Sequence, residues 1–463
     1  GGAPPGLPHG TMKEGTDEAT PLVPKDGEAL KRLAVLASCV GFLADSYDLF
    51  TIDLVVLILE LHYGEALISA KSKALMVSTM LFGVVAGQLL FGALADRWGR
   101  KWTFVSTAGL TVFSCLASAL CGDGDGQALP ALPVQLALCR FVLGCGVGGE
   151  YPLSATVSAE AVADGNSRGQ VMALVVSMQG FGMLLASLLA LLLLHFGGLS
   201  LEALWRLLLA FGAIPSAIAF CLRWQLTESE AFQESQRSKV RLEQSHGQKV
   251  LETLGSYWHL LLGTSSAWLL MNLFMYSLGS FKSSIFVAAI HSTAAADQVW
   301  DQALFASLTS AFAIAGFAAG FLLIRSTSRF YMQFYGFLAL SAIFLGVSVF
   351  TQLQPNPSAS SLLMIMGLVF FLLNSGPNLT TYILSAECFP TCCRATCHGV
   401  SAACGKLGAC VGTAAFPLLQ RYCGMPAVYL ACGAASALGA LVTYGLTPRD
   451  GVMAPDIPKF PSP

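Results

Sequence analysis

The sequence predicts an all-α, polytopic membrane protein in which twelve transmembrane helices form two pseudo-symmetric six-helix halves. Three observations predict this fold class: the composition, the spacing of the apolar runs and an internal repeat. Of the 463 residues, 55% are hydrophobic and 11% are charged, whereas roughly 25% charged residues is usual in soluble domains. So few charges cannot cover the surface of a soluble protein of this size, and the expected solvent is therefore the lipid bilayer.

Twelve apolar stretches are each long enough to cross a bilayer as a helix, which takes about 20 residues. They are expected near residues 32–57, 74–96, 102–121, 133–159, 169–194, 204–223, 257–281, 303–324, 331–352, 361–384, 397–418 and 425–446. The most polar stretch after the N-terminal tail lies between the sixth and the seventh. The predicted organisation is a disordered cytoplasmic tail (1–30), a first half (31–223), a cytoplasmic linker (224–256), a second half (257–447) and a cytoplasmic C-terminal tail (448–463). The excess of Lys and Arg in the tails, the linker and alternate loops predicts that both termini are cytoplasmic.

The two halves share a short repeat. Ser-Ala-Glu closes the fourth predicted helix at residues 158–160 and the tenth at residues 385–387. Counting from the two glutamates pairs equivalent positions of the halves: Tyr151 with Asn378, and Gln179 with Lys406. Two halves related by an axis along the membrane normal, with a binding site between them, are a known plan of secondary transporters.

Other classes of protein and site are disfavoured. The net charge of −2 predicts no nucleic-acid partner. The 14 cysteines mostly lie singly in apolar runs, and Cys388, Cys392, Cys393 and Cys397 lack zinc spacing, so we expect no disulfide framework, metal, cofactor or enzymatic activity. The G-x-G-x-x-G pattern at 144–149 lies inside an apolar span, where close helix packing explains it better than nucleotide binding.

The loop from Gly87 to Lys101 is more specific. Asp96, Arg97 and Arg100 can form charge pairs that hold one conformation and break in another. This loop resembles the one between the second and third helices in the major facilitator superfamily. Charges at the same side of the membrane are expected to belong to the same gate: Glu160, Arg168, Glu387 and Arg394.

Three further stretches narrow the resemblance. Residues 41–50 (GFLADSYDLF), residues 148–156 (GGEYPLSAT) and residues 376–409 resemble the phosphate:proton symporter family, the fungal and plant high-affinity phosphate transporters. The resemblance covers essentially the whole chain after residue 30. It implies a twelve-helix carrier that imports inorganic phosphate with protons. The phosphate contacts that it implies are Tyr151, Gln179, Trp268, Asn272, Tyr276, Asn378 and Lys406.

Four charges lie deep in the predicted spans, and their cost constrains their roles. Asp45, Asp48, Glu150 and Lys406 would together cost on the order of 10 kcal/mol if unpaired. Asp45 and Asp48 lie on one helical face, and two neighbouring carboxylates repel until one of them holds a proton. We therefore expect Asp45, Asp48 and Glu150 to carry protons. Lys406, the one strongly basic residue placed deep in a span, is expected to attract phosphate and, when the site is empty, to lose a proton or to pair with Asp45.

The sequence departs from the family pattern at three positions. Asn272 and Glu150 stand where the family usually has aspartate, and Thr107 stands where some fungal members have an acidic residue. Asn272 can accept a hydrogen bond but cannot titrate, so one site of proton coupling is expected to be weaker.

Several alternatives stay open from the sequence alone. The chain can be a carrier of an organic phosphoester such as a glycerophosphodiester or glycerol 3-phosphate, or a phosphate sensor that does not transport; a channel is the least favoured. We expect a functional monomer in contact with membrane lipid, in the plasma membrane.

Overall fold

The computed structural model describes residues 1, 27–122, 131–162, 165–241, 246–290, 294–354 and 357–449, and these form fourteen helices. The predicted tails at residues 2–26 and 450–463 lie outside the described residues. The helices are α1 (Gly27–Tyr63), α2 (Ala70–Trp98), α3 (Arg100–Leu120), α4 (Leu132–Ala161), α5 (Gly165–Gly197), α6 (Leu201–Phe211), α7 (Ala213–Trp224), α8 (Glu230–Arg241), α9 (His246–Ile290), α10 (Ala295–Leu323), α11 (Arg329–Leu353), α12 (Ala359–Ser375), α13 (Pro377–Glu387) and α14 (Arg394–Leu446).

The predicted twelve spans correspond to these helices once three breaks are recognised. α6 and α7 form one span interrupted at Gly212, and α12 and α13 form one span interrupted at Gly376. α14 contains two spans that meet at Gly424, whose φ of 80° is the left-handed conformation that glycine tolerates. By length and composition, nine helices of the described chain can cross a membrane, and α14 counts once among them.

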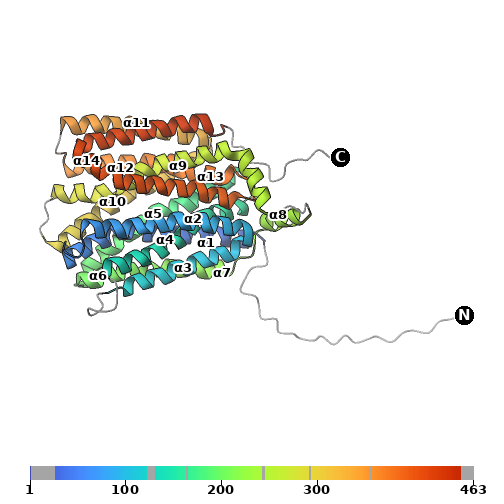
Figure 1. Ribbon diagram of the computed structural model, residues 1–463, viewed down its shortest axis with the longest axis horizontal. Coiled ribbons are helices and arrows are strands. Elements are labelled where there is room, and N and C mark those ends of the chain that lie inside the picture. The colour runs from blue at the N-terminus through green and yellow to red at the C-terminus, as the bar shows by residue number, and fades with distance from the viewer. Residues whose placement is uncertain are drawn as a thin grey trace.

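The chain folds into two bodies of helices, α1–α7 and α9–α14 (Figure 1). The linker helix α8 lies at one end of the molecule, where α1 begins and α14 ends. This end is called the linker end below, and the other is called the opposite end. The linker predicted for residues 224–256 is therefore partly helical, and α9 already begins at His246.

Glycines bring α2 and α4 into backbone contact. A Cβ on Gly87 would overlap the Cys145 carbonyl oxygen, and one on Gly148 would overlap the Val84 carbonyl oxygen. The G-x-G-x-x-G pattern therefore serves helix packing, as predicted, because only glycines allow two helices to approach this closely.

We predict that Gly87→Ala destabilises the protein by roughly 2 kcal/mol, since overpacking at a backbone contact forces the helices apart. Thermal unfolding in detergent should occur at a clearly lower temperature than in the wild type. Gly445→Ala is the matched control, because a Cβ on Gly445 meets nothing within 4 Å. Equal melting temperatures for the two variants would contradict the packing role.

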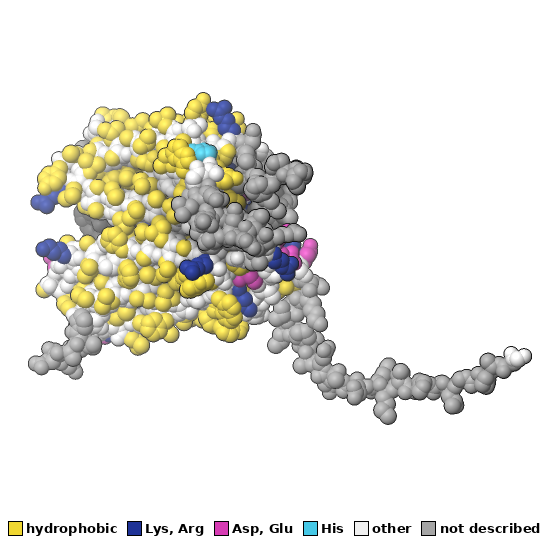
Figure 2. All heavy atoms as spheres, turned by 45° about the vertical axis from the view of Figure 1, so that its right-hand side comes forward, with side chains coloured by type: hydrophobic (Ala, Val, Ile, Leu, Met, Phe, Trp, Pro, Cys, Tyr) yellow, Lys and Arg dark blue, Asp and Glu magenta, His cyan; other side chains and the backbone are white. Residues whose placement is uncertain are grey.

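Hydrophobic side chains cover most of the described surface on the face that Figure 2 shows. Large apolar residues such as Phe82, Phe113 and Leu441 are exposed, as expected where lipid is the neighbour. Exposed Trp and Tyr side chains gather at the helix ends of the linker end: Trp98, Trp102, Trp224, Trp258, Tyr331, Tyr335 and Tyr444. Such an aromatic belt is typical of a membrane–water interface.

Candidate transport site

All seven predicted phosphate contacts line one cavity between the two halves. Tyr151 (α4) and Gln179 (α5) come from the first half, and Trp268, Asn272, Tyr276 (α9), Asn378 (α13) and Lys406 (α14) come from the second half. Three residues that sequence reasoning did not name complete the lining: Val176, Met275 and Tyr382. Tyr382 could have been predicted from the sequence, because it follows Asn378 by four residues and so lies on the same helical face.

Helix geometry explains how these side chains meet. Trp268, Asn272 and Tyr276 recur every four residues of α9 and so point to one side. α14 packs directly on this helix, since a Cβ on Gly405 would lie 2.8 Å from Trp268 Cδ1. Lys406, the next residue, is thereby held at the cavity, twelve residues or about 18 Å along the helix from Arg394.

Neutral polar groups bridge the two halves across the cavity. Asn378 Nδ2 donates to Gln179 Oε1 at 3.0 Å and to Asn374 Oδ1 at 2.7 Å. Just outside this bridge, the hydroxyl groups of Ser154 and Tyr382 share a hydrogen bond of 3.0 Å. The cavity is therefore a small space that hydrogen-bonding side chains surround.

Lys406 is the single cation among the described residues that line the cavity. Its Nζ donates to the Tyr276 hydroxyl, lies 3.5 Å from the Tyr151 hydroxyl and sits 4.2 Å from the centre of the Tyr276 ring. None of the ten described residues that line the cavity is acidic. One ammonium group among neutral donors suits a small anion.

Of the two alternatives expected for Lys406 in the empty site, loss of a proton or pairing with Asp45, the structure does not show the pairing. Lys406 instead contacts the two tyrosines. Asp45 is buried and forms no hydrogen bond or ion pair with any residue of the described chain. The charged groups whose field acts on Asp45 are Glu150, Arg223, Asp48 and Lys406.

The other two predicted proton carriers have partners. Asp48 Oδ2 accepts from Cys115 Sγ at 3.3 Å, and the Arg140 guanidinium donates to the Asp48 backbone carbonyl at 3.2 Å. Glu150 Oε2 lies 2.5 Å from Arg223 Nη2. The proton-carrying roles of Asp45, Asp48 and Glu150 stay predictions.

The prediction that Lys406 is the one strongly basic residue deep in a span is wrong. Arg140 and Arg223 are each only 1% exposed. Arg140 lies within the predicted span 133–159, and Arg223 closes the span 204–223, so their positions suggested helix ends facing water. A long side chain can extend from a helix end into the core, which sequence position alone does not reveal.

Most predicted gate charges meet at the linker end. Arg100 Nη2 lies 3.1 Å from both Asp96 Oδ1 and Glu160 Oε1. In the second half, Arg329 Nη2 lies 3.2 Å from Glu387 Oε1, and the field of Arg168 also acts on Glu387. Each half thus holds an arginine against the glutamate of its Ser-Ala-Glu repeat. Arg97 differs, because its side chain is exposed and forms no ion pair with the described residues.

Direct contacts between the halves close this end. Arg394 Nη1 of the second half lies 3.6 Å from Glu160 of the first. Arg100 donates to the Thr391 carbonyl at 2.9 Å, and Asp96 Oδ2 accepts from the backbone N–H of Thr396 at 2.7 Å. These contacts hold the two halves together at the linker end.

The linker reinforces the same gate. Glu228 accepts hydrogen bonds from the backbone N–H groups of Arg100 at 2.8 Å and Lys101 at 3.3 Å, and so caps the start of α3. Ser229 donates to Glu160 Oε2. Glu228 and Ser229 were not predicted from the sequence, because their contacts depend on how the linker folds against α3 and α4.

We predict that Glu160→Gln loosens the gate, since it removes the charge that holds Arg100 and Arg394 together. Amide hydrogen exchange of residues 390–400 should accelerate about tenfold or more. Glu202→Gln, which breaks an exposed pair with Arg206 at the opposite end, is the control and should leave these amides unchanged. Equal exchange in both variants would remove Glu160 from the gate.

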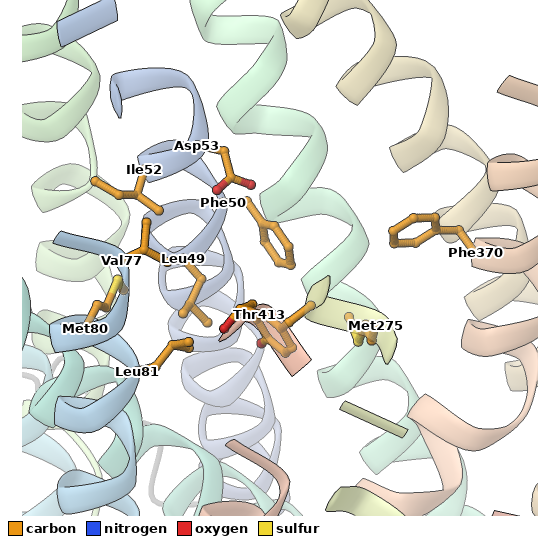
Figure 3. Close-up of a pocket in the computed structure, with 11 residues that line it drawn as sticks. Leu49, Phe50, Ile52, Asp53, Val77, Met80, Leu81, Met275, Phe370 and Thr413 are labelled. Atoms are coloured by element: carbon orange, nitrogen blue, oxygen red, sulfur yellow. The ribbon is translucent and has the colours of Figure 1, made fainter. Parts of the chain in front are cut away.

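A second cavity approaches the site from the opposite end. Side chains of α1, α2, α9, α12 and α14 surround it (Figure 3). Met275 and Tyr276 line both cavities and separate them, and Phe50 stacks on Tyr276 with ring centres 6.3 Å apart. A displacement of Tyr276 and Phe50 would therefore join the site to this cavity.

The comparisons with known proteins agree with this site. A family model described as "Sugar (and other) transporter" matches residues 33–449. Inorganic phosphate transporter 1-1 of Oryza sativa subsp. japonica is 31% identical over 441 residues, covering 83% of this chain and 83% of the relative. The chain belongs to the phosphate:proton symporter family. Another relative in this family, low affinity inorganic phosphate transporter 1 of Petunia hybrida, is 30% identical over 439 residues, with coverage of 83% and 82%. These relatives are transporters rather than enzymes, in agreement with the prediction.

Solved structures support the fold of this family member. The major facilitator superfamily proton:xylose symporter XylE, bound to 6-bromo-6-deoxy-D-glucose, superposes with a TM-score of 0.75 at 18% identity, covering 91% of this chain and 97% of XylE. An inward open XylE structure from E. coli gives a TM-score of 0.65. The predicted twelve-helix major facilitator fold is confirmed.

Proposed function

We propose that this chain imports inorganic phosphate together with protons by alternating access. The observation that carries the proposal is the cavity between the halves, in which Lys406 and the neutral groups of Tyr151, Gln179, Asn272 and Asn378 converge. The names of the phosphate transporters that are its relatives support the same substrate.

The anion would sit between Gln179 and Lys406. Displacement of the Asn378 amide from Gln179 frees one donor and one acceptor, and Lys406 can leave its tyrosines to contact an anionic oxygen. Asn272 offers its amide without a charge, which removes the repulsion that a carboxylate there would exert on the anion.

Protonation of Asp45 supplies the coupling. An isolated buried carboxylate is costly, so Asp45 favours the protonated form when the anion enters beside it. Release of the proton on the cytoplasmic side leaves a carboxylate that attracts Lys406, and Lys406 then lets the anion go. The closed gate at the linker end and the cavity toward the opposite end correspond to loading from outside.

The orientation and location belong to the same proposal. The linker end would be cytoplasmic, with both termini on that side, and the opposite end would face the exterior of the plasma membrane. The cavity is built from one chain, which supports a functional monomer.

Uptake of radiolabelled phosphate into proteoliposomes tests the function. With purified full-length protein, an acidic exterior should increase uptake several-fold over equal pH on both sides. Uptake that ignores the gradient would reject proton coupling, and absence of uptake would reject phosphate transport.

The small cavity favours inorganic phosphate over an ester. Unlabelled phosphate should compete with the radiolabel far better than glycerol 3-phosphate does, because the bridge between Gln179 and Asn378 leaves little room for a glycerol group. Stronger competition by the ester would identify a phosphoester carrier instead.

A further inference from the structure

Among the described residues, six Asp, Glu, Lys and Arg side chains are buried between the gate and the opposite end, and their formal charges sum to zero. They are three acids, Asp45, Asp48 and Glu150, and three bases, Arg140, Arg223 and Lys406. Burial of this many charges requires compensation at short range. The structure therefore raises the question of which acid each base compensates.

Arg223 is built into a site that fits Glu150. Besides the 2.5 Å ion pair, its Nη1 donates to the Phe104 carbonyl at 3.2 Å and lies 3.4 Å from Thr107 Oγ1. Its guanidinium carbon lies 3.8 Å from the centre of the Phe104 ring. Four independent contacts thus fix the guanidinium group.

Gly41 makes room for this pair. A Cβ at Gly41 would overlap both Arg223 Nη2 and Glu150 Oε1. The absence of a side chain on α1 therefore lets the guanidinium and the carboxylate meet against the backbone of α1, where water has little access.

Whether the two charges of a pair lie in the same half decides whether the pair persists through the transport cycle. Arg223 and Glu150 both belong to the first half. Arg140 and Asp48 also belong to it, where the Arg140 guanidinium contacts the backbone carbonyl of Asp48 and its positive charge acts on the Asp48 carboxylate. In alternating access one half rocks against the other largely as a rigid body, so contacts within a half persist through the cycle. Asp45 forms no ion pair with an arginine of the described chain. Lys406, whose positive charge acts on Asp45, belongs to the other half.

We propose that Arg223 is a positioning residue that keeps Glu150 ionised throughout the transport cycle, so that Asp45 is the one carboxylate that takes up and releases the co-transported proton. The inference rests on the proposed function and narrows the predicted set of three proton carriers to one. Thr107 and Phe104, which hold Arg223, act through the same pair.

One proton on Asp45 compensates one negative charge of the anion. With the six side chains named above ionised, their charges sum to zero, so a monovalent phosphate adds one negative charge, which a proton on Asp45 cancels. His398 is also buried nearby, where its Nδ1 lies 2.9 Å from Ser385 Oγ, and its ring packs against Trp268 rather than facing Asp45.

A double variant distinguishes whether Glu150 is a permanent counter-ion of Arg223 or a proton carrier. Glu150→Gln together with Arg223→Gln removes both charges and keeps hydrogen-bonding groups of similar length. Proton and phosphate entry are measured together in proteoliposomes, with an entrapped pH dye and radiolabelled phosphate. The expected result is a slower uptake with the wild-type ratio of protons to phosphate, since the carrier Asp45 is intact.

Single variants of Arg223 test whether Glu150 depends on its positive charge. Arg223→Gln alone leaves Glu150 without its cation, so uptake should fall about tenfold or more and acquire an additional dependence on acidic pH. Arg223→Lys should restore most of the activity and the wild-type pH profile. A double variant that exchanges phosphate but no longer moves protons would overturn the proposal, because Glu150 would then be a carrier.

Infrared difference spectroscopy decides the question without relying on transport. The pH-dependent carbonyl band of a buried protonated carboxyl group should disappear in Asp45→Asn and persist in the double variant. Persistence of that band in Asp45→Asn would overturn the proposal even if the double variant does not fold. If the wild type moves no phosphate, the proposed function fails, while the band still reports which carboxyl group holds the proton.

Discussion

Lys406→Ala is expected to abolish phosphate uptake. The lysine is the one cation among the described residues of the cavity, and it is held at the site between the hydroxyls of Tyr151 and Tyr276. Truncation of one partner of a buried charge pair costs about 2–5 kcal/mol. The apparent affinity for phosphate should therefore fall by roughly 30-fold or more.

Saturation curves of radiolabelled phosphate uptake measure this loss. Lys71→Ala, which removes an exposed lysine at the opposite end, is the matched control and should transport as the wild type does. Near-normal uptake by Lys406→Ala would place the anion elsewhere in the molecule.

Asp45→Asn is expected to remove the response to a pH gradient while phosphate exchange continues. The amide has nearly the same shape as the carboxyl group, but it cannot release a proton and so mimics the loaded state permanently. Uptake driven by an acidic exterior should fall to the rate measured without a gradient. Exchange of internal for external phosphate, which needs no net proton movement, should persist.

Both assays are made on the same proteoliposomes, so loss of the fold is distinguished from loss of coupling. Glu65→Gln, an exposed carboxylate at the opposite end, serves as the control. A gradient response that survives in Asp45→Asn would show that another group carries the proton.

The cavity lining could be predicted because it depends on regular helix geometry. A four-residue period places Trp268, Asn272 and Tyr276 on one face of α9, and the repeat places Gln179 and Lys406 at equivalent depths in the two halves. The resemblance to a transporter family then selected these residues from other polar stripes. The seven side chains meet at one cavity for that reason.

The charge partners could not be predicted, because they depend on side-chain reach and on gaps between helices. The pairing of Arg223 with Glu150 requires the space beside Gly41, and the position of the Asp48 carboxylate depends on its hydrogen bond with Cys115. Arg97 lies one position away from the buried Asp96, and that rotation of about 100° around α2 turns it to the surface.

The gate at the linker end also combines residues that could be predicted with one that could not. Asp96, Arg100, Glu160 and Arg394 were predicted as charges of one gate, and they meet at the linker end. The part played by Glu228, which caps α3 from the linker, depends on a loop fold that helical periodicity does not specify.

The central claim is that a phosphate anion binds between the two halves at Lys406. The most direct measurement is an electron cryomicroscopy map of the purified full-length chain in phosphate, compared with a map of the same preparation without it. We predict a tetrahedral density between Gln179 and Lys406, with the Gln179–Asn378 hydrogen bond opened. Active protein whose maps show the cavity unchanged, or the anion bound at another place, would contradict the claim.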